Sequence, residues 1–147
     1  KKYVKKNSKI LSKLYMKEII FLLVSNNKDD AILQMGMIGS QFQRIKSSIS
    51  HIITNYQDKI NIDELAQKAA MSSSSFHKYF KDVTGLSPIQ FQKKTRLMNA
   101  RGHIISSSKD IAEIAFEVGY ESPSQFSREY SRQFGHSPKE ERSNVLE

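Results

Sequence analysis

The stretch IDELAQKAAMSSSSFHKYFKDVTGLSP, residues 62–88, occurs a second time in diverged form as IAEIAFEVGYESPSQFSREYSRQFGHSP, residues 111–138. The two stretches align along their whole length when one residue is inserted after Ser122. The identical pairs are Ile62/Ile111, Glu64/Glu113, Ala66/Ala115, Ser73/Ser122, Ser74/Ser124, Phe76/Phe126, Gly85/Gly135, Ser87/Ser137 and Pro88/Pro138. This self-similarity indicates an internal repeat, so both copies are expected to fold alike.

Each copy has the pattern of two short helices joined by a tight turn. A short amphipathic segment leads into a turn, a second amphipathic segment, a glycine and a Ser-Pro pair. Gly119 occupies the sharp turn of the second copy, where glycine tolerates backbone angles that other residues avoid. Ala70 takes its place in the first copy, and its small side chain lets the two helices approach. This order predicts two helix-turn-helix units.

Every proline of the chain follows a serine, in the pairs Ser87-Pro88, Ser122-Pro123 and Ser137-Pro138. A glutamine or glutamate stands three residues after each serine. The serine hydroxyl can accept from the third amide of a helix, while the glutamine or glutamate bonds back to the serine amide. Proline at the first helical position loses no hydrogen bond. Helices are therefore expected to begin near residues 88, 123 and 138.

Apolar residues at helical spacing predict the other helices, and no segment shows the sustained alternation of a strand. The expected helices cover residues 8–25, 31–38, 41–56, 62–69, 72–84, 88–105, 110–118, 123–134 and the chain from 138 onward. The expected inward residues include Phe42, Ile45, Ile49, Ile52, Ile53 and Tyr56 in the third helix, and Phe91, Thr95, Met98 and Ile105 in the sixth. The chain is predicted to be all-α.

Composition excludes several kinds of site. The chain has no cysteine, and its four histidines lack metal-site spacing, so neither a metal nor a cofactor is expected. No acid/base pair stands beside a nucleophile, which argues against an enzyme. The longest apolar run, residues 19–24, is far shorter than the roughly 20 residues of a membrane span.

The net charge of +8 is unevenly distributed. Residues 1–59 carry 11 Lys or Arg against 4 Asp or Glu, whereas residues 60–147 carry 12 against 11. Lysines crowded near one end of a chain usually form a solvated helix face or tail. The total charge is therefore weak evidence for nucleic-acid binding.

The second helix of each copy presents hydroxyl, amide and cationic side chains once its aromatic residues are assigned inward. These outward residues are Ser74, Ser75, His77, Lys78 and Lys81 in the first copy, and Ser124, Gln125, Ser127, Arg128 and Arg132 in the second. Such groups suit base edges and phosphates of DNA. The alternative is a helical protein–protein adaptor without DNA binding, whose affinity would not fall steeply with salt.

Over about residues 42–141, the chain resembles the DNA-binding region of the AraC/XylS family of bacterial transcription regulators. The resemblance is carried by Ile62–Ala66, Met71–Phe76, Phe80-Lys81, Thr84–Pro88, Ile111–Ala115, Val118–Tyr120, Ser122–Arg128 and Phe134–Pro138. It implies two helix-turn-helix subdomains, homeodomain-like three-helix units joined by a central linking helix and preceded by N-terminal linker helices.

The resemblance also implies a division of the chain into three regions. Residues 1–40 would be the tail of an effector or sensor region with linker helices. Residues 41–105 would form the first helix-turn-helix subdomain, including the linking helix, and residues 106–147 the second. Because the chain also begins at Lys1 without methionine, we expect a fragment of a longer cytoplasmic, nucleoid-associated protein whose N-terminal effector domain is missing.

The implied partner is double-stranded DNA. Recognition helices at about 73–84 and 123–134 would enter successive major-groove segments, about one turn or ~34 Å apart. The implied base contacts are Ser74, His77, Lys78, Ser124, Gln125, Ser127 and Arg128, and the implied phosphate contacts are Ser72, Lys81, Ser122 and Arg132. RNA polymerase is a candidate further partner, an activator role is expected, and no membrane is involved.

Two arginines on the linking helix, Arg96 and Arg101, have two interpretations. They pair with Glu113 or Glu117 and stiffen the spacing of the copies, or they remain solvated.

Overall fold

The computed structural model describes residues 41–146, and all regular structure in this part of the chain is helical. The helices are α3 (Gln41–Thr54), α4 (Ile62–Lys68), α5 (Ser73–Thr84), α6 (Pro88–Ser106), α7 (Ile111–Glu117), α8 (Pro123–Phe134) and α9 (Pro138–Leu146). The all-α prediction is confirmed, as are the three helix starts at prolines. The helices expected at 8–25 and 31–38 and the sensor-region tail assigned to 1–40 lie outside the described residues.

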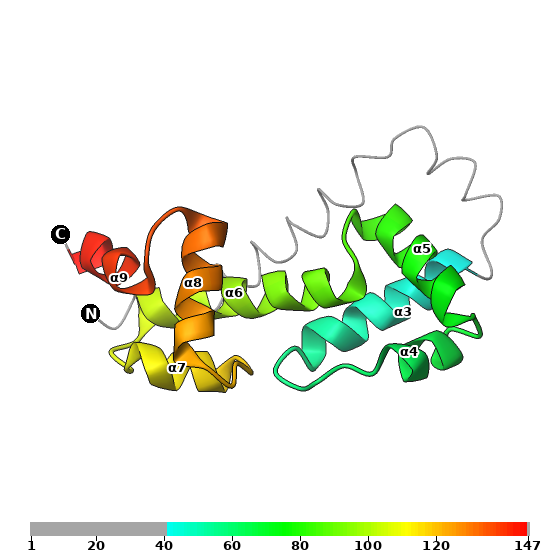
Figure 1. Ribbon diagram of the computed structural model, residues 1–147, viewed down its shortest axis with the longest axis horizontal. Coiled ribbons are helices and arrows are strands. Elements are labelled where there is room, and N and C mark those ends of the chain that lie inside the picture. Colours follow the sequence, from blue (N-terminus) through cyan, green and yellow to red (C-terminus); the bar gives the residue numbers. More distant parts are fainter. Residues whose placement is uncertain (1–40, 147) are drawn as a thin grey trace. The chain divides into compact units, whose positions relative to one another are not determined.

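The described helices form two compact units. The N-terminal unit contains residues 41–55 and 59–93, and the C-terminal unit contains residues 56–58 and 94–146. The continuous helix α6 contributes to both, because the division falls after Lys93 (Figure 1). The sequence-based boundary after residue 105 assigned this helix wholly to the first subdomain.

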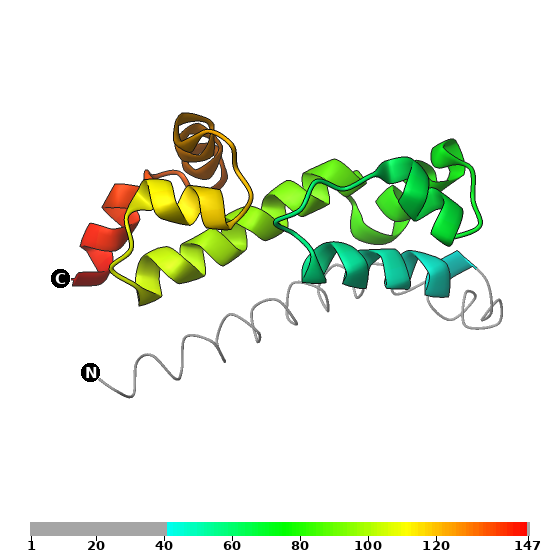
Figure 2. The same ribbon diagram turned by 90° about the horizontal axis from the view of Figure 1, so that it is seen from below.

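The core of the N-terminal unit lies between α3, α4, α5 and the first turn of α6, with α3 along one side of the unit (Figure 2). Its buried residues are Ile45, Ile52, Leu65, Ala66, Ala69, Phe76, Phe80 and Phe91. The ring centroid of Phe80 lies 5.7 Å from that of Phe76 and 5.6 Å from that of Phe91. The inward assignment of Phe42 is wrong. This side chain is 44% exposed, since it lies in the first turn of α3, before the buried part of the helix that begins at Ile45.

The core of the C-terminal unit combines the second half of α6 with α7 and α8. Its buried residues are Leu97, Ala100, Ile104, Ile111, Ile114, Ala115, Val118, Tyr120, Phe126 and Tyr130, with Tyr56 and Phe134 packed against them. The inward assignment of Ile105 is wrong, since it is 41% exposed while Ile104 is buried. α6 serves two cores in succession, so the single apolar stripe assumed for its whole length does not exist.

The turns of both copies use left-handed backbone. Ala70 has φ 52° and Gly119 has φ 93°, while Gly85 and Gly135 end α5 and α8 with φ 74° and 80°. Gly119 meets a second constraint, because a Cβ there would stand 2.9 Å from both Cα and the carbonyl carbon of Gln57. Glycine is therefore required at this turn for close approach as well as for backbone geometry.

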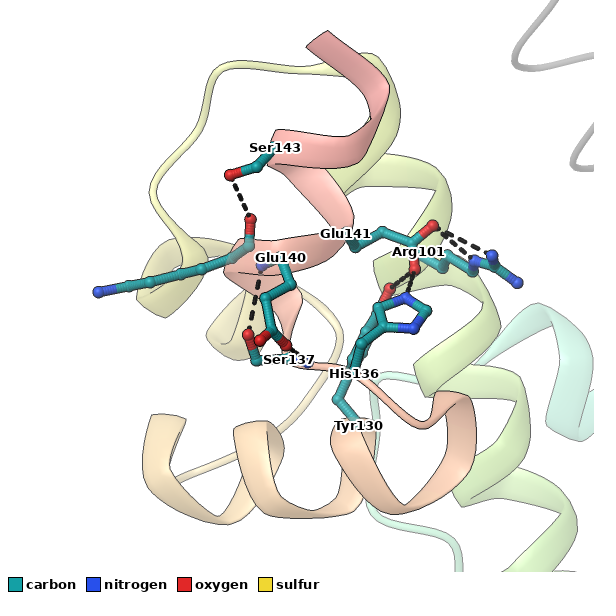
Figure 3. Close-up of polar contacts among 8 residues, drawn as sticks. Arg101, Tyr130, His136, Ser137, Glu140, Glu141 and Ser143 are labelled. Atoms are coloured by element: carbon teal, nitrogen blue, oxygen red, sulfur yellow. Dashed lines mark hydrogen bonds and ion pairs between the residues drawn. The ribbon is translucent and has the colours of Figure 1, made fainter. Parts of the chain in front are cut away.

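A buried carboxylate, Glu141, joins three elements of the C-terminal unit (Figure 3). Arg101 of α6 donates to its Oε1 from Nε at 3.1 Å and from Nη2 at 3.0 Å. The Tyr130 hydroxyl of α8 donates to Oε2 at 3.3 Å, and His136 also contacts Oε2. Burial alone would raise the pKa of Glu141, but the hydrogen bonds from His136 and Arg101 bring that pKa below its ordinary value. In the first copy the corresponding position is Phe91, which packs on Phe80.

Candidate nucleic-acid interface

The second helices of the two copies, α5 and α8, have the same length and the same ends. Each has 12 residues, begins after a serine cap and stops at a left-handed glycine. The caps are Ser72 and Ser122, which makes these two residues equivalent. The alignment that paired Ser73 with Ser122 is therefore wrong at this point, and the extra residue of the second copy is Glu121. The alignment is unchanged beyond this point, so Ser75 matches Gln125 and Lys78 matches Arg128.

α5 buries its aromatic side and exposes a polar one. Phe76 and Phe80 are fully buried, whereas Ser74, His77, Lys78 and Lys81 are exposed. Aromatic and polar residues thus separate onto two faces, as the sequence predicted.

The hydroxyls at the start of α5 are engaged in local bonds. Ser72 Oγ accepts from the Ser75 amide at 3.2 Å and donates to Ser75 Oγ at 3.0 Å. Ser73 Oγ donates to Asp63 of α4, which ties the two helices of the motif together. The Ser72 hydroxyl is therefore occupied by the cap of its own helix.

α8 repeats the arrangement with larger polar groups. Ser124, Gln125, Arg128 and Arg132 are exposed and Ser127 is partly buried. Phe126 and Tyr130 are fully buried, with ring centroids 5.6 Å apart.

The predicted capping box at Ser122 forms only in part. Ser122 Oγ accepts from the Gln125 amide at 3.3 Å. The Gln125 side chain makes no bond back to the Ser122 amide, and its Nε2 instead donates to Glu129 Oε1 at 3.1 Å. The boxes at Ser87 and Ser137 form in both directions, with bonds of 2.6–3.2 Å.

Four cations stand on the exposed faces of the two helices without a carboxylate partner among residues 41–146: Lys78, Lys81, Arg128 and Arg132. The ion pairs of Arg101 and His136 with Glu141 and of Lys109 with Glu117 lie elsewhere in the described part. The four cations of α5 and α8 therefore make no direct ion pair in this part of the chain.

Arg96 has partners that no local pattern could reveal. The sequence suggested Glu113 or Glu117, or free solvation, but Arg96 instead donates to three consecutive carbonyl oxygens. These belong to Tyr56 at 2.7 Å, Gln57 at 3.0 Å and Asp58 at 3.2 Å. Arg101, for which the same acids were suggested, pairs with Glu141 and lies 4.9 Å from the ring centroid of Phe134. Both arginines stabilise the C-terminal unit.

The described residues hold no cluster of His, Asp or Glu that could bind a metal ion. None of the helices between residues 41 and 146 is both long and apolar enough to cross a membrane.

Residues 65–144 match the family model described as a helix-turn-helix domain, and this match covers more than half of the chain. A probable AraC family transcriptional regulator from Rhodopseudomonas palustris has a similar structure, with a TM-score of 0.64 and 25% identity, over 70% of this chain and 97% of that one. The chain belongs to the AraC family of helix-turn-helix transcription regulators.

Two relatives named as HTH-type regulators are also similar in sequence. An uncharacterized HTH-type transcriptional regulator from Haemophilus influenzae is 29% identical over 127 residues, which cover 86% of this chain and 43% of the relative. The HTH-type transcriptional activator RhaS of Escherichia coli is 27% identical over 124 residues, or 84% of this chain and 44% of RhaS. The chain therefore spans less than half the length of these relatives.

The fold is also that of the DNA-binding domain of AdpA, a global transcriptional factor whose structure contains a target DNA. The TM-score is 0.65 at 24% identity, over 72% of this chain and 93% of the AdpA chain. At this identity the likeness concerns the fold.

In this AraC-family chain, each helix-turn-helix copy brings together its own group of predicted site residues. Ser72, Ser74, His77, Lys78 and Lys81 lie on or at the start of α5, and Ser122, Ser124, Gln125, Ser127, Arg128 and Arg132 on or at the start of α8. The residue that sequence reasoning missed is Glu129, which holds the side chain of Gln125. Its spacing of four residues from Gln125 was the available signal.

Proposed function

We propose that the chain binds double-stranded DNA with sequence preference, using α5 and α8 as recognition helices in successive major-groove segments. The observation that carries the proposal is the repeated pair of exposed cations on matching faces, Lys78 with Lys81 and Arg128 with Arg132, none of which makes an ion pair among residues 41–146. Phosphate neutralisation by such cations supplies affinity, while side chains at base edges supply preference.

Lys78 and Arg128 are the proposed readers with the greatest reach. They occupy the same position of their helices, and lysine or arginine can donate to guanine O6 and N7. The other proposed base contacts are shorter or neutral side chains: Ser74, His77, Ser124, Gln125 and Ser127. Because Ser127 is partly buried, only its hydroxyl group would contact a base.

Phosphate contacts are proposed for Lys81, Arg132 and the starts of α5 and α8. Since the hydroxyls of Ser72 and Ser122 cap their helices, their role would be to place backbone amides toward a phosphate.

The whole protein is proposed to regulate transcription in the bacterial cytoplasm, at the nucleoid. RhaS, a relative, is named an activator, and we propose the same direction of control here. An N-terminal effector domain and RNA polymerase are the proposed partners of the whole protein.

Replacing Arg128 by alanine should weaken binding to a preferred site by about 1–3 kcal/mol and relax the preference at one base pair. The measurement is the affinity for a selected duplex and for its single-base variants. An equal loss on all duplexes would identify Arg128 as a phosphate contact.

Replacing Lys81 by alanine should weaken binding about equally on all sequences, and the slope of log affinity against log salt should fall by about one unit. Lys46→Ala, which removes the same charge from an exposed position of α3, is the matched control and should leave the slope unchanged. Equal slopes for Lys81→Ala and the unmodified chain would contradict the phosphate assignment, and salt-independent binding would favour an adaptor.

A further inference from the structure

A chain of hydrogen bonds runs from the core of the C-terminal unit to an exposed side chain of α8. The hydroxyl of buried Tyr120 donates to Glu129 Oε2 at 2.8 Å. Glu129 Oε1 accepts from Gln125 Nε2 at 3.1 Å. Glu129 is partly buried and Gln125 is exposed, so these hydrogen bonds lead from the core to the surface through three residues.

The chemistry of Glu129 decides which way the Gln125 amide turns. An ionised carboxylate accepts hydrogen bonds but cannot donate them, so it must face the NH₂ group of Gln125. The carbonyl oxygen of Gln125 is then directed away from Glu129. Without the carboxylate, the two ends of the amide would be interchangeable at similar energy.

Glu129 is itself fixed by a hydrogen bond from Tyr120, on the core side of α8. Burial, followed by the hydrogen bond to Glu129, raises the pKa of Tyr120 above its usual range, so its hydroxyl remains a donor. The Arg96 guanidinium lies 5.9 Å from the ring centroid of Tyr120. Both oxygens of Glu129 are thus engaged by groups that fix the carboxylate in one position.

The first copy lacks the residues for such a series of hydrogen bonds. In the corrected register Met71, Ser75 and Tyr79 stand where the second copy has Tyr120, Gln125 and Glu129. Met71 and Tyr120 have equivalent backbone bonds, to Ala66 and Ala115 at 2.9 and 3.0 Å, so the difference lies in the side chains. The arrangement is therefore a property of the second recognition helix and not a requirement of the fold.

We propose that Glu129 is a positioning residue for base recognition, which holds the Gln125 amide with its carbonyl oxygen toward the DNA. This inference rests on the proposed function. In the major groove a carbonyl oxygen finds donors at adenine N6 and cytosine N4, whereas guanine O6 and thymine O4 are acceptors. The second recognition helix therefore selects adenine or cytosine at the strand position that faces Gln125.

The experiment is a double-mutant cycle on the 147-residue chain. Duplexes are selected from a random pool with the unmodified chain, Gln125→Ala, Glu129→Ala and the double variant, and affinities are measured for all four bases at each position. The preference for an amino base at one position should fall about threefold to tenfold in Glu129→Ala, the worth of one hydrogen bond. In the Gln125→Ala background, Glu129→Ala should change the preference no further.

Tyr120→Phe provides a second variant, which keeps the ring in the core. It should lower the preference at the same base position in the same direction, because Glu129 loses the hydrogen bond from the Tyr120 hydroxyl. Thermal unfolding of each variant separates loss of fold from loss of preference.

The outcomes distinguish the inference from the function on which it rests. An unchanged preference in folded Glu129→Ala or Gln125→Ala, while the unmodified chain still selects a sequence, would overturn the positioning role and leave the proposed function intact. A further change from Glu129→Ala in the absence of Gln125 would also overturn it. If the unmodified chain selects no sequence, the proposed function itself fails.

Discussion

Replacing Gly119 by alanine should lower the free energy of unfolding of the C-terminal unit by about 2–4 kcal/mol. About 1–2 kcal/mol comes from placing a Cβ at positive φ, and the remainder from forcing it against the backbone of Gln57. Because the obstacle is backbone and not the end of a flexible side chain, it cannot move aside at little cost. Denaturant unfolding followed by circular dichroism measures the change.

Gly135→Ala is the matched control for this prediction. Gly135 also has a positive φ, but a Cβ there meets nothing within 4 Å. Its cost should be limited to the same backbone strain, about 1–2 kcal/mol. Equal losses in the two variants would show that the approach to Gln57 contributes nothing.

Replacing Glu141 by glutamine should lower the free energy of unfolding at neutral pH by about 1–3 kcal/mol. Removing one partner of a buried ion pair costs about 3–5 kcal/mol, but the side chain of Arg101 is 40% exposed and water can solvate its charge again. The same unfolding measurement applies, and Glu140→Gln is the control. Glu140 is exposed and bonds the Ser137 amide, a bond that glutamine also makes at Ser87.

The pH dependence of this effect follows from the lowered pKa of Glu141. A carboxyl whose pKa is lower in the folded than in the unfolded chain stabilises the fold above the unfolded value, here 4.5, and that contribution disappears as the pH falls through the folded value. The difference in stability between the unmodified chain and Glu141→Gln should therefore be full above about pH 5.5 and shrink below pH 4.5. A difference that grows as the pH falls below 4.5 would contradict the assignment.

The predictions that succeeded from sequence rest on local chemistry. The helix starts at the Ser-Pro pairs and the stops at Gly85 and Gly135 act within one turn of their own position, and the structure contains each of them. The repeat also placed Phe76 and Phe126 correctly in equivalent cores. Both assignments used only the spacing of apolar residues within a single helix.

The predictions that failed depend on contacts distant in sequence. The three carbonyls that bind Arg96 lie about 40 residues away, and Glu141 lies at the same separation from Arg101. The stripe ending at Ile105 assumed one core for a helix that serves two. The Gln125 side chain had two possible local partners, the Ser122 amide and the Glu129 carboxylate. The capping pattern alone does not indicate that Glu129, one turn later, accepts the hydrogen bond from Gln125.

The central claim is that the duplicated helix-turn-helix motif binds DNA through both of its second helices. Its most direct test is a hydroxyl-radical and methylation footprint of the chain on a duplex selected from a random pool. Two protected major-groove segments, about one helical turn apart on the same face of the duplex, are the expected result. Lys78→Ala should weaken protection of one segment and Arg128→Ala that of the other. A single protected segment, or weakening of the same segment by both variants, would contradict the claim.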